Sequence, residues 1–503
     1  MSKLWRAIQG VADNSHSKPA LIGMNKAYSY AELVVSVKRL AKELSGFKNQ
    51  VLALYIDNCP EWIMIDLACQ LAGITLLPLP QFFSDQQLTH AVMQAGARAV
   101  IHSNGDRLSS LFNVDESVCM HSGFVVSTLP SASVALPKQT AKITFTSGST
   151  GEPKGVCLSN NQQLLVAQAL KKVVNLGAKK HLSLLPFSTL LENVAGVYLT
   201  LLSAGSVLAL TQKSMGFTGS SGLNIEAFLN TLHAHQPSSL IVLPELLLAL
   251  IKSIEKGWRL PASLKFIAVG GSNVSLALLN KAKRLGLPVY EGYGLSECSS
   301  VVSLNNQKNL KVGSVGKPLT HVSVQINKGE VMISGNTFLG YIDQADKWGQ
   351  TLLATGDLGY LDDEGYLFIN GRKKNLLISS FGRNINPEWV EGCALSNGLL
   401  KQCVVVGDAK PYCTALLYLA NPLTGVSQIK QWIDTVNGSL PDYAQIKKWL
   451  ILDKPFSVKA GLLTANGRPK RRAILKAYQH RIDAIYGVEL YTSHIKRRVT
   501  DVF

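Results

Sequence analysis

A loop of hydroxyl groups and glycines is the part of this chain best suited to chemistry. The run ITFTSGSTGEPKG, residues 143–155, leaves an apolar strand and closes on a single lysine. Backbone N–H groups freed by glycine, together with hydroxyls and an ammonium, form a cradle for polyphosphate. The spacing lacks the Gly-Lys-Ser/Thr ending of the common P-loop, and an ordinary polar hairpin is the alternative. The predicted cradle consists of Thr146, Ser147, Gly148, Ser149, Thr150, Gly151 and Lys154.

A second cluster lies at residues 290–297, YEGYGLSE, where we expect a strand to end in a glycine-rich turn. The ring of Tyr293 can stack on a purine. The carboxylate of Glu297, beside a triphosphate, suits Mg²⁺, because hard cations share oxygen ligands with phosphate. The alternative is a buried strand end with a solvent-facing glutamate. Glycines at another strand end permit close approach to a flat ligand. The residues assigned to the nucleotide are Gly270, Gly271, Ser272, Gly292, Tyr293, Gly294 and Ser296.

A third cluster combines Thr355-Gly-Asp357 with Gly371-Arg372. An aspartate can accept hydrogen bonds from both ribose hydroxyls, as it does in other nucleotide sites. An arginine further along the chain can neutralise phosphate with its planar fork of donors. Asp357 and Arg372 are therefore predicted to bind a nucleotide.

The elements that must position these residues alternate between strand and helix. An apolar strand at 51–56, a helix at 61–72 and a strand at 74–79 form a βαβ unit. Strands with nearly continuous apolar residues are typical of a parallel sheet covered on both faces. Polar or glycine-rich loops follow such strands, and α/β proteins gather ligands there. The strand pattern returns at residues 182–185, 206–210, 240–243, 266–269 and 289–290.

The pattern of predicted strands and helices changes towards the C-terminus. Short strands and tight turns between residues 312 and 366 predict a small β-barrel or β-sheet subdomain, at about 305–373, within a large N-terminal domain of residues 1–373. That domain is predicted to be α/β, with βαβ-built sheets packed with helices. Residues 374–503 carry both strands and helices and predict a small α+β C-terminal domain.

Composition narrows the partners. The net charge is +17, and the residues after Lys373 contribute 18 Lys/Arg against 9 Asp/Glu, or +9. Such a surface attracts polyanions, including the phosphates of ATP and CoA, anionic lipid at a membrane surface, or an acidic carrier protein. No nucleic-acid-binding motif is present, so we expect no nucleic acid. Eight scattered cysteines suggest reduced thiols, hence a cytoplasmic protein. The longest apolar run, 240–251, is too short to span a bilayer.

In order and spacing, the motifs between residues 143 and 472 resemble those of the adenylate-forming (ANL) superfamily of AMP-dependent synthetases and ligases. The acyl-pocket segment Leu185–Glu192, with Thr189 where relatives place a histidine, looks closest to bacterial long-chain fatty acyl-CoA synthetases. The resemblance implies that a carboxylic acid attacks Mg·ATP to give acyl-AMP and pyrophosphate. A thiol, CoA most simply, then takes the acyl group after the small C-terminal lid rotates. ATP, Mg²⁺ and CoA are thereby implied, with Glu297 as the metal ligand and Thr150 among the catalytic residues.

Two further positions depart from the family pattern. The final motif normally ends in Gly-Lys, but this chain has Gly467-Arg468, with Lys470 two residues later. Because arginine is permanently charged and forks toward oxyanions, Arg468 is the favoured equivalent and Lys470 the second choice. A basic surface turn or a nuclear-import-like run is the alternative. The hinge aspartate of the family is replaced by Asn375, which tolerates unusual backbone angles almost as well.

Other functions remain open at this point. An acyl-AMP ligase that loads an acyl carrier protein would use the same motifs. A non-catalytic nucleotide-binding relative is the alternative of another class, and Lys154, Glu297, Asp357 and Arg372 argue against it. The identity of the acid, the acceptor and the oligomeric state are not specified by the residues.

Overall fold

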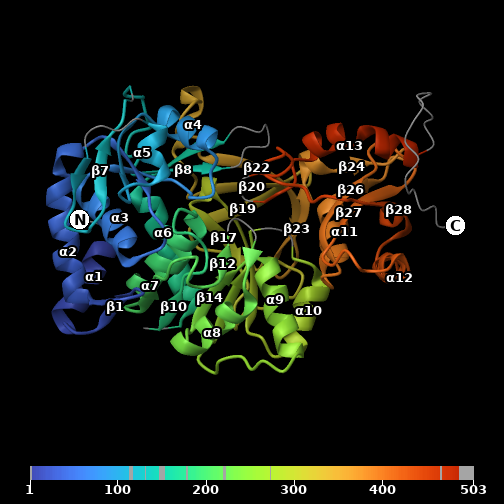
Figure 1. Cartoon of the computed structure of the whole chain (residues 1–503), viewed down its shortest axis with the longest axis horizontal. Coiled ribbons are helices and arrows are strands. Elements are labelled where there is room, and N and C mark those ends of the chain that lie inside the picture. Colours follow the sequence, from blue (N-terminus) through green and yellow to red (C-terminus); the bar gives the residue numbers. More distant parts are fainter. Residues whose placement is uncertain are drawn as a thin grey trace.

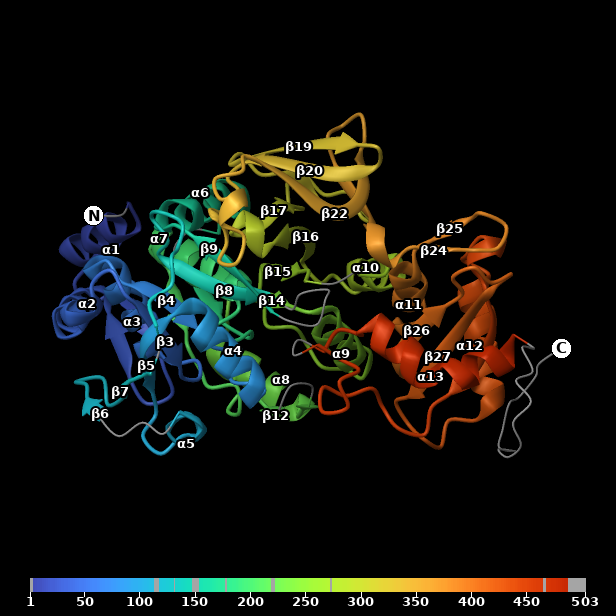
Figure 2. The same ribbon diagram turned by 90° about the horizontal axis from the view of Figure 1, so that it is seen from above.

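The computed structural model describes most of the chain, and helices α1 (Lys3–Asn14) and α13 (Arg471–Ile485) lie on opposite sides of the molecule (Figure 1). Helices and strands of the N-terminal two thirds form one large body, beside which the C-terminal part forms a smaller one (Figure 2). The described residues are 3–112, 117–130, 132–146, 153–176, 179–218, 222–271, 274–464 and 467–486.

The first sheet has the strand order β21-β9-β8-β4-β3-β5-β7-β6. Its centre is parallel, and β3 and β4 are joined through helix α3, as the βαβ prediction requires. Alternate residues of β3 enter two different cores: Leu52 and Leu54 face one, Val51 and Ala53 the other. The strands are β3 (Val51–Tyr55), β4 (Thr75–Pro78), β5 (Ala97–His102), β6 (Ser117–Cys119), β7 (Val125–Thr128), β8 (Lys142–Thr146), β9 (Lys154–Leu158) and β21 (Gly340–Tyr341).

The second sheet has the order β18-β17-β16-β15-β14-β10-β11-β1-β2, and its strands from β11 to β16 are parallel. A small separate hairpin, β12 (Phe217–Thr218) and β13 (Gly222–Leu223), lies outside it. The strands of this sheet are β1 (Pro19–Ile22), β2 (Ala27–Ser29), β10 (Lys180–Leu182), β11 (Ser206–Leu208), β14 (Ser239–Val242), β15 (Phe266–Val269), β16 (Val289–Leu295), β17 (Ser300–Leu304) and β18 (Lys317–Pro318).

Helices separate and cover the two sheets. One core contains side chains of both sheets and of α1, α2, α3 and α6, while α4 covers the outer face of the first sheet and α8, α9 and α10 that of the second. Ser29 and Glu32 form a capping box at the start of α2, since the Ser29 hydroxyl accepts from Glu32 N and the Glu32 carboxylate accepts from Ser29 N. The helices are α1 (Lys3–Asn14), α2 (Tyr30–Glu43), α3 (Pro60–Ala72), α4 (Asp85–Ala95), α5 (Arg107–Leu111), α6 (Asn160–Val174), a π-helix (Glu192–Tyr198), α7 (Leu199–Leu202), α8 (Ile225–His235), α9 (Pro244–Glu255) and α10 (Leu276–Arg284).

The β-rich subdomain is a sheet and not a closed barrel. Its order is β19-β20-β22-β23, all antiparallel, and the two outer strands are not hydrogen-bonded to each other. Four short strands cannot close around a core, so one face packs on Val302 and Val315 of the large body. The strands are β19 (Val322–Asn327), β20 (Glu330–Gly335), β22 (Leu352–Leu361) and β23 (Leu367–Arg372).

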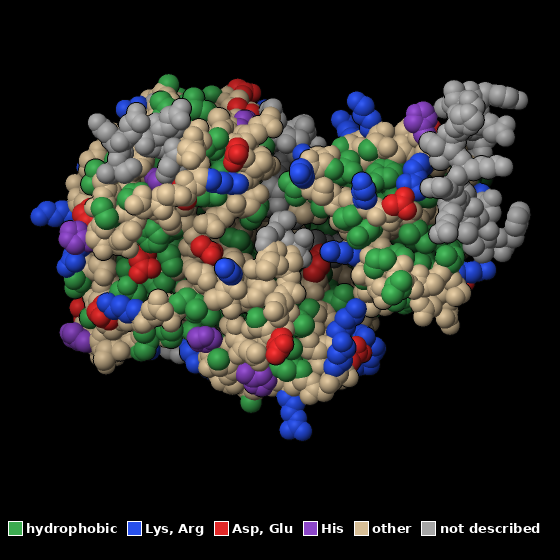
Figure 3. Space-filling model, in the orientation of Figure 1, with side chains coloured by type: hydrophobic (Ala, Val, Ile, Leu, Met, Phe, Trp, Pro, Cys, Tyr) green, Lys and Arg blue, Asp and Glu red, His purple; other side chains and the backbone are tan. Residues whose placement is uncertain are grey.

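The C-terminal part is α+β, as expected. A 3-10 turn at Lys373–Asn375 leads into the β24–β25 hairpin, and a three-stranded sheet, β26-β27-β28, lies between helices. On the face in Figure 3, Lys and Arg side chains are spread over this part and gather near α10. The elements are β24 (Leu377–Ile378), β25 (Asn384–Ile385), α11 (Pro387–Leu395), β26 (Leu400–Val406), β27 (Cys413–Leu419), α12 (Val426–Asn437), β28 (Ile446–Ile451) and α13 (Arg471–Ile485).

One local prediction is wrong. The glycine-rich turn expected after Tyr290 is strand, because β16 continues to Leu295 and pairs antiparallel with β17. Gly294 makes this possible, since a Cβ there would lie 1.7 Å from the carbonyl oxygen of Ser300. Within the described ranges, no helix is long and apolar enough to cross a membrane.

Candidate active site

Three of the predicted nucleotide residues meet around one buried carboxylate. Asp357 on β22 lies opposite Arg372 on β23 in the antiparallel ladder. Its Oδ1 is 2.7 Å from Arg372 Nε, and its Oδ2 accepts a 2.6 Å hydrogen bond from the hydroxyl of Tyr293 on β16. The residue is 3% exposed. Thr355 supports it, because its Oγ1 accepts from Asp357 N at 3.0 Å.

Burial controls the protonation of this group. It raises the pKa of Asp357, and the charge of Arg372 opposes that rise. Burial and the neighbouring Asp357 hold the pKa of Tyr293 well above its ordinary value. The phenol therefore stays protonated and donates a hydrogen bond to Asp357. The arrangement places an oriented carboxylate, a cation and an aromatic ring together, and these groups suit the ribose, phosphate and purine of a nucleotide.

A second group joins the predicted metal ligand to the predicted phosphate lysine. The hydroxyl of Tyr341 on β21 donates to Glu297 Oε1 at 2.6 Å. The ammonium of Lys154 lies over the Tyr341 ring, 5.2 Å from its centre. Thr146 and Lys154 are paired across the β8–β9 ladder, so both stand at the mouth of the predicted cradle. Ser147, Gly148, Ser149, Thr150, Gly151 and Ser272 lie outside the described residues.

The predicted glycines serve packing as well as access. A Cβ on Gly270 would lie 2.9 Å from the carbonyl oxygen of Gly292, so the two strand ends approach too closely for a side chain. Gly271 has a φ of +84°, a conformation that L side chains rarely adopt. Ser296 begins a 3-10 turn, Ser296–Cys298, that carries Glu297 back toward β21.

The last motif separates Arg468 from Lys470. A tight turn holds Arg468, whose backbone N–H donates to Thr464 Oγ1 at 3.1 Å. Its guanidinium reaches out of the C-terminal part and donates to the carbonyl of Gly271. Lys470 instead caps the start of α13, with its backbone N–H on the Leu462 carbonyl at 2.8 Å.

The neighbouring basic residue is structural. Arg471 forms a 2.5 Å ion pair with Glu391, a buried carboxylate of α11, and donates to the Val405 carbonyl at 3.1 Å. This part of the basic run is therefore not a free surface turn. At the predicted hinge, Asn375 Nδ2 donates to Glu388 Oε1 at 2.6 Å.

Sequence reasoning missed the residues that hold the acyl-pocket segment. Asn58, only 2% exposed, donates to the Leu185 carbonyl and accepts from Phe187 N, both at 2.8 Å. Glu192, fully buried, accepts from Leu185 N at 3.0 Å and contacts His181 Nε2 at 2.7 Å. No local pattern points to the contacts of Asn58, because this residue lies 127 residues before Leu185.

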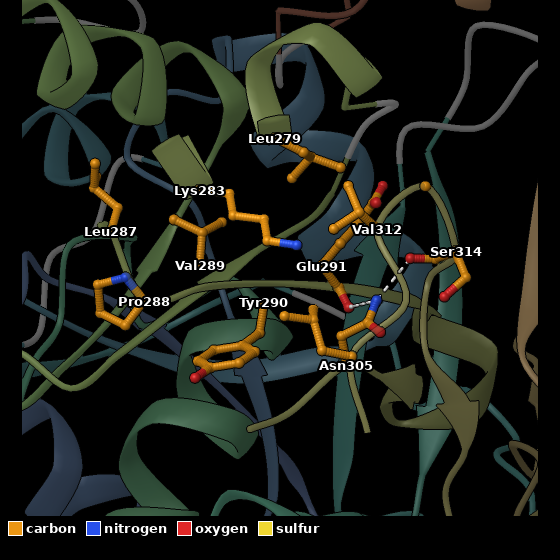
Figure 4. A pocket seen from close by; sticks show the side chains of 12 residues that line it. Leu279, Lys283, Leu287, Pro288, Val289, Tyr290, Glu291, Asn305, Val312 and Ser314 are labelled. Atoms are coloured by element: carbon orange, nitrogen blue, oxygen red, sulfur yellow. Dashed lines mark hydrogen bonds between the residues drawn. The ribbon is translucent and has the colours of Figure 1, made fainter. Parts of the chain in front are cut away.

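A pocket lies between α10 and the loop that follows β17 (Figure 4). Glu291 lines it from β16, two residues before Tyr293 and therefore on the same face of the strand. Burial raises the pKa of Glu291 to about 8. The Lys283 side chain points toward Glu291, without forming an ion pair with it.

The comparisons with known proteins decide the family. A family model of AMP-binding enzymes matches residues 8–342, and the model of the C-terminal domain of AMP-binding enzymes matches residues 374–489. This chain belongs to the AMP-binding enzyme family. The predicted membership in the ANL superfamily and the α/β architecture are thereby confirmed, and an AMP-forming acid–CoA ligase is the type of enzyme supported. ATP, Mg²⁺ and CoA fit this family.

Curated relatives are similar over different lengths. A 2-succinylbenzoate–CoA ligase of Bacillus velezensis is 30% identical over 426 residues, 78% of this chain and 82% of the relative. A long-chain-fatty-acid–CoA ligase of Mycobacterium tuberculosis is 32% identical over 253 residues, 44% of this chain and 42% of the relative. The likeness to this fatty acyl ligase covers less of the chain, and the comparison does not select the acid.

Solved structures agree on the fold. The O-succinylbenzoate CoA synthetase of Bacillus subtilis, in complex with AMP, superposes with a TM-score of 0.75 at 23% identity, covering 93% of this chain and 97% of that chain. An anthranilate CoA ligase in complex with anthranoyl-AMP has a TM-score of 0.79 at 16% identity, covering 95% and 97%. Both matches extend over the large body and the C-terminal part.

Proposed function

We propose that this AMP-binding enzyme activates an aliphatic monocarboxylic acid of the fatty acid class and transfers it to CoA. The observation that carries the choice of acid is the chemistry of the acyl-pocket segment. This segment, Leu185–Glu192, reads LPFSTLLE and contains no Lys, Arg or His. Two buried basic side chains near the segment already have carboxylate partners: His181 contacts Glu192, and Lys142 pairs with Asp66 at 2.9 Å. A second carboxylate or a polar aryl group would find no charged partner there.

The adenylation step needs positioning more than covalent help from the protein. A carboxylate oxygen of the acid bonds to the α-phosphorus of ATP while the bond to the pyrophosphate leaving group breaks, which gives acyl-AMP. Catalysis then consists of holding the reactants in line and neutralising phosphate charge. We assign Lys154, with Thr146 and the cradle, to the β- and γ-phosphates, Asp357 to the ribose and Tyr293 to the adenine.

Magnesium fits the residues present. Among the described residues, no three His, Cys, Asp or Glu side chains gather into a metal site. Glu297 supplies a single carboxylate beside Lys154 and Tyr341, and Mg²⁺ is commonly held by one or two carboxylates while phosphates and water complete its shell. Bound there, the ion would neutralise charge on the phosphates.

Arg468 is the residue that we assign to the reacting oxygens. It reaches the Gly271 carbonyl beside the Asp357 group, whereas Lys470 is held at the start of α13. Arg372, Glu388 and Asp357 are close enough to act on its charge. CoA is the acceptor proposed for the second step, in which its thiolate attacks the acyl carbon and AMP leaves.

The test is pyrophosphate release against a panel of acids, with and without CoA. Saturated fatty acids of several lengths are compared with 2-succinylbenzoate and anthranilate. We expect kcat/KM for the preferred fatty acid to exceed that for 2-succinylbenzoate at least about tenfold, because an unpaired second charge is costly to bury. A higher kcat/KM for 2-succinylbenzoate would overturn the proposal. If pyrophosphate release with a fatty acid does not change when CoA is added but rises when an acyl carrier protein is added, the acceptor is the carrier protein and not CoA.

A further inference from the structure

Tyr341 connects two groups that the motifs place far apart in the chain. It lies on β21, a two-residue strand that pairs with β9, where Tyr341 is opposite Val156. This pairing brings the ring against Lys154, two residues before Val156. The backbone also joins it to the metal carboxylate, because Phe338 N–H donates to the Glu297 carbonyl at 2.7 Å.

Each end of the Tyr341 side chain has a partner. The hydroxyl donates to Glu297 Oε1 at 2.6 Å, and the ring face lies beneath the Lys154 ammonium at 5.2 Å. Within the described part of the chain, Glu297 Oε2 has no hydrogen-bond partner and Lys154 has no carboxylate partner.

The ring is held rigidly. Trp348 Nε1 donates to the Tyr341 carbonyl at 2.7 Å, and the Phe338 ring meets the Tyr341 ring edge-on at 4.8 Å. Gly340 has a φ of +141°, and a Cβ there would lie 2.4 Å from Trp348 Cδ1. Ile342 N–H donates to the Gly155 carbonyl at 3.0 Å, which ties the strand to the end of the predicted cradle. Such enclosure leaves the hydroxyl and the ring face little freedom to turn away.

We propose that Tyr341 is a positioning residue for the magnesium nucleotide: its hydroxyl orients the Glu297 carboxylate with Oε2 free for the metal, and its ring holds the Lys154 ammonium ready for phosphate. The proposal rests on the assignment of ATP to this site but not on the identity of the acid. A carboxylate with one oxygen anchored needs no reorientation when the metal nucleotide binds. A lysine held on a ring gives up only a weak contact when phosphate arrives.

The two parts of Tyr341 predict two different defects. Tyr341→Phe keeps the ring and removes the hydroxyl, so it disturbs Glu297 alone. Tyr341→Leu removes both. ATP binding is measured by calorimetry without any acid, once in excess Mg²⁺ and once in EDTA, so that no turnover occurs.

For Tyr341→Phe we expect the dissociation constant of ATP in Mg²⁺ to rise about tenfold, the size of one hydrogen bond to a charged group, and the constant in EDTA to change less than about twofold. The Mg²⁺ concentration for half-maximal pyrophosphate release should rise as well. Tyr341→Leu should in addition weaken binding in EDTA. The matched control is Tyr360→Phe, because Tyr360 is an exposed tyrosine stacked on Phe368 at 4.8 Å.

Two outcomes overturn the proposal. One is that Tyr341→Phe weakens ATP binding equally in Mg²⁺ and in EDTA, which would mean that Tyr341 has a general structural role. The other is unchanged or tighter Mg·ATP binding, which would mean that the hydroxyl competes with the metal for Glu297. Because no acid is present, a wrong choice of fatty acid leaves both readouts unaffected.

Discussion

Glu291 offers a test of how strongly this fold can hold a carboxylic acid in its neutral form. Its pKa is raised from 4.5 to about 8, and burial is the cause. Since the folded protein keeps the proton to a higher pH than the unfolded chain, the folded state binds more protons between these two values. Stability is therefore lost as the pH rises through this window. The side chain of Glu291→Gln has nearly the same shape and stays neutral at every pH.

The magnitude follows from the shift. A pKa that is higher by about 3.5 in the folded state lowers the free energy of unfolding by about 5 kcal/mol at high pH. Roughly 2 kcal/mol of this loss has already occurred near pH 6, and about 2.5 kcal/mol more is lost between about pH 6 and about pH 9. Over that pH range, the free energy of unfolding of Glu291→Gln should therefore rise by about 2.5 kcal/mol relative to that of the unmodified protein.

The assay is urea-induced unfolding of both proteins at a series of pH values, with ATP absent. The control is Glu226→Gln, because Glu226 is an exposed glutamate on α8. The plot of unfolding free energy against pH for this variant should run parallel to that of the unmodified protein. Parallel curves for Glu291→Gln as well would refute the reasoning, because they would show that water reaches the carboxylate in the pocket of Figure 4.

Other perturbations test the remaining assignments. Glu297→Ala should lower ATP–pyrophosphate exchange by about two orders of magnitude, the usual size for one lost electrostatic stabiliser, and near-normal exchange would remove it from the metal site. Arg468→Ala should impair acyl-AMP formation and spare thioester formation from supplied acyl-AMP; if Lys470→Ala alone shows this pattern, the assignment passes to Lys470. Lys142→Ala should destabilise the protein by about 3–5 kcal/mol in thermal unfolding, since it leaves Asp66 charged and buried, and Lys142→Ala combined with Asp66→Ala should recover part of that loss.

Motifs with their chemistry in adjacent residues were predictable. Asp357, Arg372 and Tyr293 could be assigned because each stands in a short pattern whose residue types suit a nucleotide, and the structure brings all three within hydrogen-bonding distance. The central βαβ unit was equally readable, since continuous apolar strands and a capped helix are local signals. The acid was not predictable in this way, because selectivity depends on the shape and charge of a cavity.

Where local preference and long-range pairing disagree, pairing decides. The residues Gly292-Tyr293-Gly294 favour a turn when read alone, but β17 supplies a complete set of backbone partners and the segment becomes strand. The short strands of the β-rich subdomain were compatible with either a β-barrel or a β-sheet. Their number and pairing give an open sheet that lies against the large body.

The amino-acid sequence by itself determined the family and the order of the elements, because these depend on residue type and short spacing, and it predicted the residues that we assign to the nucleotide. Only the tertiary structure decided how the residues are oriented. Tyr341 meets Glu297 across 44 residues, and Asn58 holds Leu185 across 127. Such contacts arise from strand pairing and packing between distant segments, and neither leaves a periodic or local trace in the chain.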